Sequence, residues 1–415
     1  MSTIQAHLPE SVPTVVPAAP EAGRSQRARI ITALSFSHML NDMYSNYLPQ
    51  MLPFLVVLIP GFTATQAAIL ISVFTIVASF AQPVFGQLFD GRGKGWIFNF
   101  GTIWMAALLS LTGIVHSFPV LVVISGLSGL GTAAFHPQAS TLVSNAAGSR
   151  KAVILSGFIA FGNLGFALSP LLLIPIFQAY GLTATVFTVI PGLIVALVLF
   201  FLTPRSVAAR SRKSTVSQLI ESLKPAAREL AILIGVIAIR SLAYTGMLAM
   251  LPLYFKSRNL SNIMSSQLLT VMLLSGAAGG IIGGFLSDRY GRKRIIAGSL
   301  IIATPLFLGF LMTHGAISIM LLALAGASLM SNFSVTVVAA QEAIPNNKAL
   351  AAGLSMGFAG GIGALAVIPV GRIGDVAGLG TAVTFLFALP LVAGIFALFL
   401  KSRPSARTLR TGNGA

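Results

Sequence analysis

One segment of this chain occurs twice, as Gly86-Gln-Leu-Phe-Asp90-Gly-Arg92-Gly-Lys94 and as Gly284-Phe-Leu-Ser-Asp288-Arg289-Tyr-Gly291-Arg292-Lys293. Asp90 and Asp288 are 198 residues apart, close to half of the 415-residue chain. Each copy lies between two apolar runs. A small residue, an acid and a basic turn at matching points of two hydrophobic halves indicate a duplicated bundle of membrane helices.

The composition places the chain in lipid. Hydrophobic residues make up 55% of it, charged residues only 8%, and the mean hydropathy is +0.90. A bilayer-spanning helix needs about 20 apolar residues. Twelve such runs occur, at 30–58, 65–88, 96–115, 119–144, 152–178, 182–202, 230–255, 264–287, 295–312, 316–341, 350–370 and 381–400. We predict an all-α integral membrane protein with twelve transmembrane helices, in two six-helix bundles related by pseudo-twofold symmetry.

Basic residues outnumber acidic ones by 26 to 9, and their placement predicts the orientation. With both termini in the cytoplasm, 22 of the 26 fall on the cytoplasmic side, which agrees with the positive-inside rule. Anionic lipid headgroups are the expected partners of these charges, and nucleic acid is not. We predict a monomeric, multi-pass protein of the bacterial cytoplasmic (inner) membrane.

Polar segments divide the chain into parts. Residues 1–29 are rich in Pro and Ala without the apolar core of a secretory signal, and we expect a disordered cytoplasmic tail. Bundles over 30–202 and 230–400 are joined by a basic cytoplasmic linker over 203–229, and 401–415 form a second cytoplasmic tail. In parallel repeats of this kind the substrate site lies between the bundles, near the midplane.

Signatures of catalysis and of metal binding are missing. Glycine-rich segments at 126–131 and 357–363 lie inside apolar runs with no strand before them, so close helix packing explains them better than phosphate binding. The sequence has no cysteine, no metal-ligand spacing and no nucleophile–base pair. We predict a protein that is not an enzyme and needs no cofactor or metal. Without a nucleotide-binding loop, an ion gradient is the expected energy source for moving a small-molecule substrate.

One of the nine acidic residues, Asp42, lies near the middle of a predicted span. A charge there costs about 2.5–3.5 kcal/mol on insertion scales, so such residues usually line a cavity and serve a function. Arg240 follows 198 residues later, at similar depth on the equivalent helix. We expect both to face one cavity, with Asp42 as proton site and Arg240 as anion site. A structural ion pair between the bundles is the alternative.

Other polar side chains are expected around this pair. His38 lies one helical turn before Asp42 on the same face, where an imidazole can relay protons near neutral pH. A histidine that only hydrogen-bonds within the bundle is the alternative. For Asn163 and Asn332, helix–helix hydrogen bonding is the stronger alternative. The candidate substrate-binding residues are Arg240, Asn41, Tyr44, His136, Asn163 and Asn332.

The repeated loops have an interpretation beyond topology. Their acids at helix ends can pair with nearby arginines and with a helix N-terminus across the bundle, which would close the cytoplasmic side. Simple retention of basic loops in the cytoplasm is the alternative. The candidate gate residues are Asp90, Arg92, Asp288, Arg289, Arg292 and Glu342.

The loop pattern resembles that of the major facilitator superfamily, and a narrower resemblance runs through nearly all spans. Ser37-His38-Met-Leu-Asn41-Asp42-Met43 is similar to the Ser-His-x-x-Asn-Asp-Met signature of the fosmidomycin-resistance type of exporter. Phe135-His136-Pro137-Gln138-Ala-Ser140 resembles its Phe-His-Pro-Glu-x-Ser motif. Matches to later spans are Phe161-Gly162-Asn163-Leu-Gly165, Ser169-Pro170-Leu-Leu and Ala340-Gln341-Glu342-Ala-Ile-Pro345. Gln138 and Ser169 stand where that family has an acid and a glycine.

The resemblance implies a proton-coupled antiporter that exports drugs, with phosphonate antibiotics as the type substrate. The residues themselves leave the direction open. If an anion at Arg240 released Asp42 from an ion pair, Asp42 would hold its proton more tightly and both would travel together, as in symport. Antiport requires the proton to weaken substrate binding, for instance where ionised Asp42 accepts a substrate hydrogen bond. We predict export of a small anionic compound, with import of an organic acid as the alternative.

Overall fold

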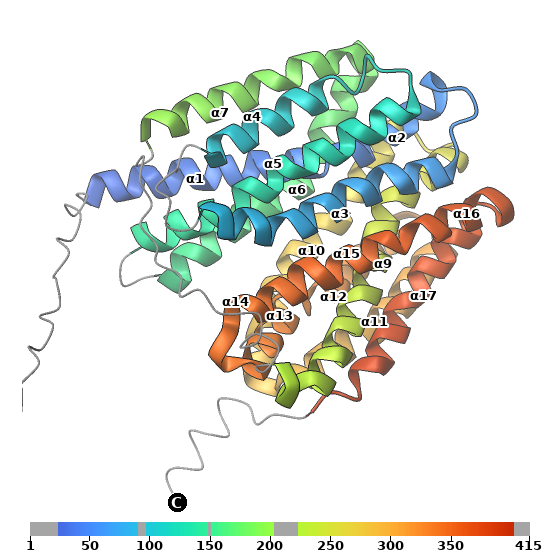
Figure 1. Cartoon of the computed structure of the whole chain (residues 1–415). Coiled ribbons are helices and arrows are strands. Elements are labelled where there is room, and N and C mark those ends of the chain that lie inside the picture. Colours follow the sequence, from blue (N-terminus) through green and yellow to red (C-terminus); the bar gives the residue numbers. More distant parts are fainter. Residues whose placement is uncertain (1–23, 90–96, 148–150, 203–222, 402–415) are drawn as a thin grey trace, which may run out of the picture.

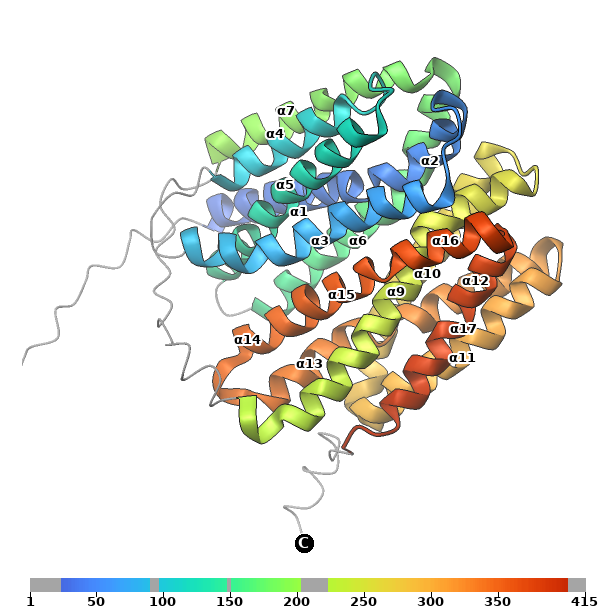
Figure 2. The same ribbon diagram turned by 45° about the vertical axis from the view of Figure 1, so that its right-hand side comes forward.

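The structure, a computed structural model, describes residues 24–89, 97–147, 151–202 and 223–401. These residues form helices and short turns, arranged as two bundles that lie side by side in both views (Figures 1 and 2). Ten helical segments in this part of the chain are long and apolar enough to cross a membrane, and the shorter apolar helix Phe100–Ser110 adds to them. The predicted all-helical membrane fold is confirmed.

The N-terminal bundle holds six spans, the first of which is broken in two. Its helices are α1 (Arg24–Ser45), α2 (Tyr47–Leu58), α3 (Ala64–Phe89), α4 (Ile97–Ser110), α5 (Phe118–Ala146), α6 (Lys151–Tyr180), the 3-10 helix Leu182–Thr188 and α7 (Val189–Leu202).

The C-terminal bundle repeats this plan. Its fourth and fifth spans are each broken into shorter helices. After the 3-10 helix Lys224–Ala226 come α9 (Ala227–Ser257), α10 (Asn262–Tyr290), α11 (Arg292–Met312), α12 (Gly315–Met330), α13 (Phe333–Ala343), α14 (Lys348–Ala352), the π-helical turn Gly353–Phe358, α15 (Ala359–Leu365), α16 (Val367–Ala377) and α17 (Leu379–Ala397). A further 3-10 turn, Pro345–Asn347, precedes α14.

Two predicted boundaries shift. Helix α1 begins at Arg24, so residues 24–29, which we assigned to the tail, are helical, whereas 1–23 lie outside the described residues. Residues 224–229 of the predicted linker belong to the 3-10 helix and to α9, and 203–222 lie outside the described residues, as do 402–415. The gate candidates Asp90 and Arg92, from the first copy of the repeated loop, lie in 90–96, which is also outside the described residues.

The first span breaks at Asn46 because of a proline. Pro49 has no N–H for the carbonyl four residues earlier, and its ring crowds that carbonyl. Helix α6 binds the backbone on both sides of the break: the Ser169 hydroxyl donates to the carbonyls of Met43 (3.0 Å) and Asn46 (3.1 Å). The Asn46 amide donates in turn to the Phe166 carbonyl (2.8 Å). Ser169, a departure from the family pattern, therefore stabilises the break just beyond Asp42.

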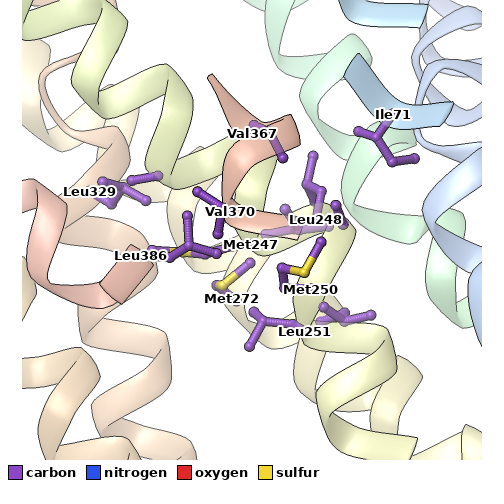
Figure 3. Packing of buried hydrophobic residues seen from close by; sticks show 14 of the residues in the cluster. Ile71, Met247, Leu248, Met250, Leu251, Met272, Leu329, Val367, Val370 and Leu386 are labelled. Atoms are coloured by element: carbon purple, nitrogen blue, oxygen red, sulfur yellow. The ribbon is translucent and has the colours of Figure 1, made fainter. Parts of the chain in front are cut away.

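Tight helix contacts come from small residues. A Cβ atom on Gly279 of α10 would lie 2.1 Å from the Ala327 carbonyl oxygen of α12, and one on Gly283 would lie 1.8 Å from that of Ser331. Such approach gives van der Waals contact between helix backbones in lipid, where no hydrophobic driving force brings helices together. Around α9, the packing is made by larger side chains of α10, α12, α16 and α17, with Ile71 of α3 approaching from the other bundle (Figure 3).

Polar contacts join the bundles at one end. We call the end with Leu58 and Gly378 the distal end, and the end with Arg24 and Lys401 the terminal end (Figure 1). At the distal end, Asp375 accepts hydrogen bonds from the backbone N–H groups of Ala64 (2.7 Å) and Thr65 (3.1 Å) and from the Thr65 hydroxyl (2.5 Å). Asp375 lies in the last turns of α16, beyond the predicted span 350–370.

Two further bonds continue this contact. Lys256 at the end of α9 donates to the carbonyl of Pro53 in α2, and Ser72 of α3 donates to the Ala364 carbonyl (2.7 Å). Among the described residues, the hydrogen bonds between the bundles lie from the distal end as far as Ser72. The remaining space between the bundles, toward the terminal end, contains the cavity described next.

Candidate functional site

A cavity of about 310 Å³ lies between the two bundles. Residues of α1, α2, α3, α5 and α6 line one wall, and residues of α9, α12, α13, the π-helical turn and α15 line the other. Asp42 and Arg240 are both among the lining residues. The structure therefore brings the one mid-span acid and the one mid-span arginine to the same cavity, from opposite bundles.

Asp42 lies between two histidines. Its Oδ2 is 3.3 Å from Nε2 of His38, and its Oδ1 is 3.4 Å from Nε2 of His136. The Asp42 side chain is 15% exposed and that of His136 is 26% exposed, whereas His38 is buried behind them. The proline after His136 lies inside α5, and the continuous helix carries the imidazole to α1. His38 and His136 thus both contact the predicted proton site.

The tautomer of His38 is fixed by the backbone. Its Nδ1 is 2.8 Å from the carbonyl oxygen of Phe158, which can only accept, so Nδ1 carries a hydrogen. In a neutral imidazole Nε2 would then present a lone pair to the carboxylate of Asp42. That contact is favourable only if a proton lies between the two groups, on Nε2 or on the carboxyl. The Nε2 atom of His38 and Oδ2 of Asp42 therefore lie close enough to share a proton.

Helix α6 supplies the floor of this cluster. The His38 ring stacks on Phe158, with ring centroids 4.1 Å apart. A Cβ atom on Gly162 would lie 2.4 Å from Cε1 of His38 and 2.5 Å from Oδ2 of Asp42. Only glycine leaves room for both side chains at this point, which gives the Gly162-Asn163 segment a physical role at the site.

Arg240 has a different environment. Its side chain is 5% exposed, its Nε has no hydrogen-bond partner, and its Cζ lies 4.9 Å from the centroid of the Phe333 ring. Among the described residues, no carboxylate lies within ion-pair distance of it. The predicted alternative of an Asp42–Arg240 ion pair is therefore not what this structure contains. Tyr244 and Ser241, one helical turn or less away, line the same cavity and were not identified from the sequence.

Four other predicted binding residues lie elsewhere. Asn41 is buried and accepts from the Thr132 hydroxyl (2.9 Å), and Tyr44 donates to the Thr188 carbonyl and accepts from the N–H of Gly192. Both bind inside the N-terminal bundle, because their helix faces point toward α5 and α7. The amide of Asn332 donates to Ser299 (3.2 Å) and Leu329 (3.0 Å), which is the helix–helix role given as its alternative. Asn163 is exposed, and none of the four lines the cavity.

The gate candidates that the structure describes lie at the terminal end of the C-terminal bundle. Arg292 contacts Asp288 (2.5 Å), Ser287 (2.6 Å) and Glu342 (3.3 Å). Arg289 instead lies over the ring of its neighbour Tyr290, at 5.4 Å. These contacts join α10, α11 and α13 of one bundle. In this structure they bridge no described residue of the other bundle, so a gate between bundles stays a prediction.

The cluster at Asp42 is also the one place in the described part of the chain where three potential metal ligands meet. One donor atom each from His38, Asp42 and His136 lie within 4.8 Å of one another. The sequence showed no such spacing because His136 comes from α5, 94 residues after Asp42. Tertiary packing alone brings the third donor to the site.

The family model of the Major Facilitator Superfamily matches residues 34–366. The chain belongs to this superfamily. It is 32% identical over 399 residues to YfnC, an uncharacterized MFS-type transporter of Bacillus subtilis (strain 168), covering 92% of this chain and 94% of that one. It is 29% identical over 302 residues to the fosmidomycin resistance protein of Escherichia coli (strain K12), covering 70% and 74% of the two chains. The chain is thus a membrane transporter and not an enzyme.

Solved structures show the same fold. A bacterial homologue of the human lysosomal transporter Spinster, in an inward-facing and unoccupied conformation, matches with a TM-score of 0.69 at 13% identity, covering 91% of this chain and 96% of that one. The nucleoside transporter NupG matches with a TM-score of 0.76 at 15% identity, covering 89% and 100%. At these identities the likeness establishes the fold of a facilitator and nothing about the substrate.

Proposed function

We propose that this facilitator is a proton-coupled antiporter that exports a small anionic, fosmidomycin-like compound by alternating access. One observation carries the proposal: one cavity has a carboxylate between two imidazoles on one wall and, on the other, a buried guanidinium that pairs with no described carboxylate. A proton and an anion can therefore bind in the same chamber at separate places, which is what coupling requires. The similarity to a protein named for fosmidomycin resistance supports the outward direction.

Each residue has a separate task in this scheme. Asp42 and His38 hold the proton, and His136 connects them to the cavity. Arg240 presents a planar fork of donors suited to a carboxylate or phosphonate, and Phe333 covers one face of the fork. Once the proton leaves, ionised Asp42 accepts a hydrogen bond from the substrate. Reprotonation removes that acceptor and favours release.

The orientation follows from the charges. We propose that the terminal end faces the cytoplasm of a bacterial cell, since 22 of 26 basic residues then lie inside. The distal end, where Asp375, Lys256 and Ser72 join the bundles, then faces outward. Among the described residues, the hydrogen bonds between the bundles lie toward this outer end, which supports a cavity that loads from the cytoplasm, as an exporter requires.

Import by symport is the second candidate, and one observation favours it. No described carboxylate pairs with Arg240, so an anion could enter beside a protonated Asp42 cluster. The route considered from sequence, in which an anion frees Asp42 from Arg240, has no basis here because Asp42 pairs with His38 and His136 instead. Antiport and symport differ in the direction in which a pH gradient drives the substrate, and this direction can be measured.

Reconstituted vesicles test the proposal. The full chain is placed in proteoliposomes with an imposed pH gradient, and uptake of fosmidomycin is followed. Antiport predicts accumulation when the lumen is acid, because protons leave as the substrate enters. Accumulation only when the outside is acid would establish symport and overturn the proposed direction. The sign does not depend on how the molecules are inserted, since the gradient alone sets it.

A further inference from the structure

Donor atoms of His38, Asp42 and His136 lie nearly as close together as the ligands of a metal ion. In a tetrahedral zinc site with bonds of about 2.0–2.1 Å, neighbouring ligand atoms lie about 3.3–3.4 Å apart. Here the His38 nitrogen lies 3.3 Å from Oδ2 of Asp42 and the His136 nitrogen 3.4 Å from Oδ1, and one donor atom from each of the three residues falls within 4.8 Å of the others. One ion could therefore bind all three residues if the donor atoms that lie farthest apart moved closer together.

The histidines are oriented as metal ligands usually are. The carbonyl of Phe158 holds Nδ1 of His38 at 2.8 Å and leaves Nε2 as the donor toward Asp42. Metal-binding histidines commonly have such a hydrogen bond on the other ring nitrogen, which fixes the tautomer and ring orientation. Stacking on Phe158 restrains the ring further. The position of Nε2 is thus set before any ion arrives.

Access and ligand chemistry narrow the class of ion. Asp42 and His136 line the cavity, so an ion reaches them through it and keeps an open coordination position on that side. Two imidazoles and one carboxylate suit Zn²⁺, Co²⁺ or Ni²⁺. Mg²⁺ and Ca²⁺ need more oxygen ligands than this cluster offers.

We propose that His38, Asp42 and His136 form a binding site for a divalent transition-metal ion of the Zn²⁺ class. The ion takes the place of the proton between His38 and Asp42, and that proton passes to solvent. Occupancy by metal and by proton is then mutually exclusive, so Zn²⁺ inhibits transport by holding the cluster in one state. The site itself requires no particular substrate or direction of transport.

Binding is tested without transport. Purified full-length chain in detergent, free of any histidine tag, is titrated with Co²⁺, whose visible absorption reports a low-coordinate site. We expect saturable binding of one ion per chain, displaced by Zn²⁺ and not by Mg²⁺. His136→Gln and His38→Gln should each weaken Co²⁺ binding by about 10-fold or more, because a three-donor site loses one of its ligands. Zn²⁺ should also slow fosmidomycin exchange in vesicles.

The chain offers a matched control. His116 and His314 are exposed and lie apart from the cluster, so the double variant His116→Gln, His314→Gln should bind Co²⁺ as the wild type does. Each variant is first checked for a single gel-filtration peak and an unchanged melting temperature, and Asp42→Asn serves as a third ligand variant. Absence of saturable Co²⁺ binding, or wild-type affinity in His38→Gln and His136→Gln, would overturn the site. Neither result would alter the vesicle test of proton coupling.

Discussion

The first helix of each bundle places an ionisable side chain on the cavity, yet the two environments are opposite. Asp42 has an imidazole on each carboxylate oxygen. Arg240, 198 residues later, has an aromatic ring on one face and an Nε without a partner. Duplication has kept the position and changed the chemistry. A satisfied carboxylate suits a proton that must be held and passed on, and an unsatisfied guanidinium suits a ligand yet to arrive.

The largest effect on transport is expected from substitution of Asp42, on the wall that the N-terminal bundle forms. Asp42→Asn keeps shape but removes the ionisable group, so gradient-driven accumulation should vanish while substrate exchange across vesicles persists. A gradient equivalent to 100 mV drives about 50-fold accumulation for one coupled charge, since it supplies about 2.3 kcal/mol. The measurement is fosmidomycin uptake with and without the pH gradient. An unchanged gradient-driven rate would remove Asp42 from coupling.

The opposite wall should respond to charge of the substrate. Arg240→Ala is expected to weaken binding of anionic compounds by about 10- to 150-fold, the equivalent of a charge-assisted hydrogen bond of about 1.5–3 kcal/mol. Neutral analogues should bind as before. Arg240→Lys is the control, because it keeps the charge without the planar fork and should lose less. Calorimetric titration measures both, and equal loss for neutral compounds would indicate a structural role.

A smaller substitution, Gly162→Ala, should affect the Asp42 cluster without affecting Arg240. Gly162→Ala should displace His38 and Asp42, because the added Cβ would lie 2.4 Å and 2.5 Å from them, and overpacking of this kind costs about 1–3 kcal/mol. We expect slower gradient-driven transport with unchanged anion affinity at Arg240. Gly157→Ala is the matched control on the same helix, since nothing lies within 4 Å of its added Cβ. Equal rates in the two variants would show that the cluster tolerates displacement.

The smallest effect is expected at the distal end, away from both walls. Asp375→Asn weakens three hydrogen bonds between α16 and α3, each worth about 0.5–1.5 kcal/mol, and should favour opening of that end about 10-fold. The chain has no cysteine, so Ser72→Cys, buried at this interface, provides a single reactive thiol. Faster maleimide labelling in Asp375→Asn than in the Ser72→Cys chain with Asp375 intact is the expected result. Equal labelling would mean that Asp375 does not hold the bundles together.

The sequence predicted the fold because lipid imposes it: apolar runs of spanning length and a repeated loop leave few other arrangements. It also predicted that Asp42 and Arg240 share a cavity, since a charge in mid-membrane has few other stable positions. It failed for Asn41 and Tyr44, whose polar groups bind within their own bundle, whereas Asn332 makes the helix–helix hydrogen bond that was favoured for it. Which face of a helix meets the cavity depends on packing, and sequence spacing does not contain that.

The contact between His136 and Asp42 also depends on helix packing and could not be predicted from sequence spacing. The two residues were each selected for being polar within a span, but their contact results from the crossing of α5 and α1. The break at Asn46 was not predicted, because the chain has 21 prolines and the sequence does not indicate that Pro49 interrupts a span.

Proton release on substrate binding tests the division of the cavity most directly. Purified protein in weakly buffered detergent receives fosmidomycin while a pH dye records the change. Antiport with Asp42 as the proton site predicts release of protons from the wild type and none from Asp42→Asn, although Asp42→Asn still binds the anion at Arg240. Release of the same size from both would show that the proton comes from elsewhere and would contradict the account.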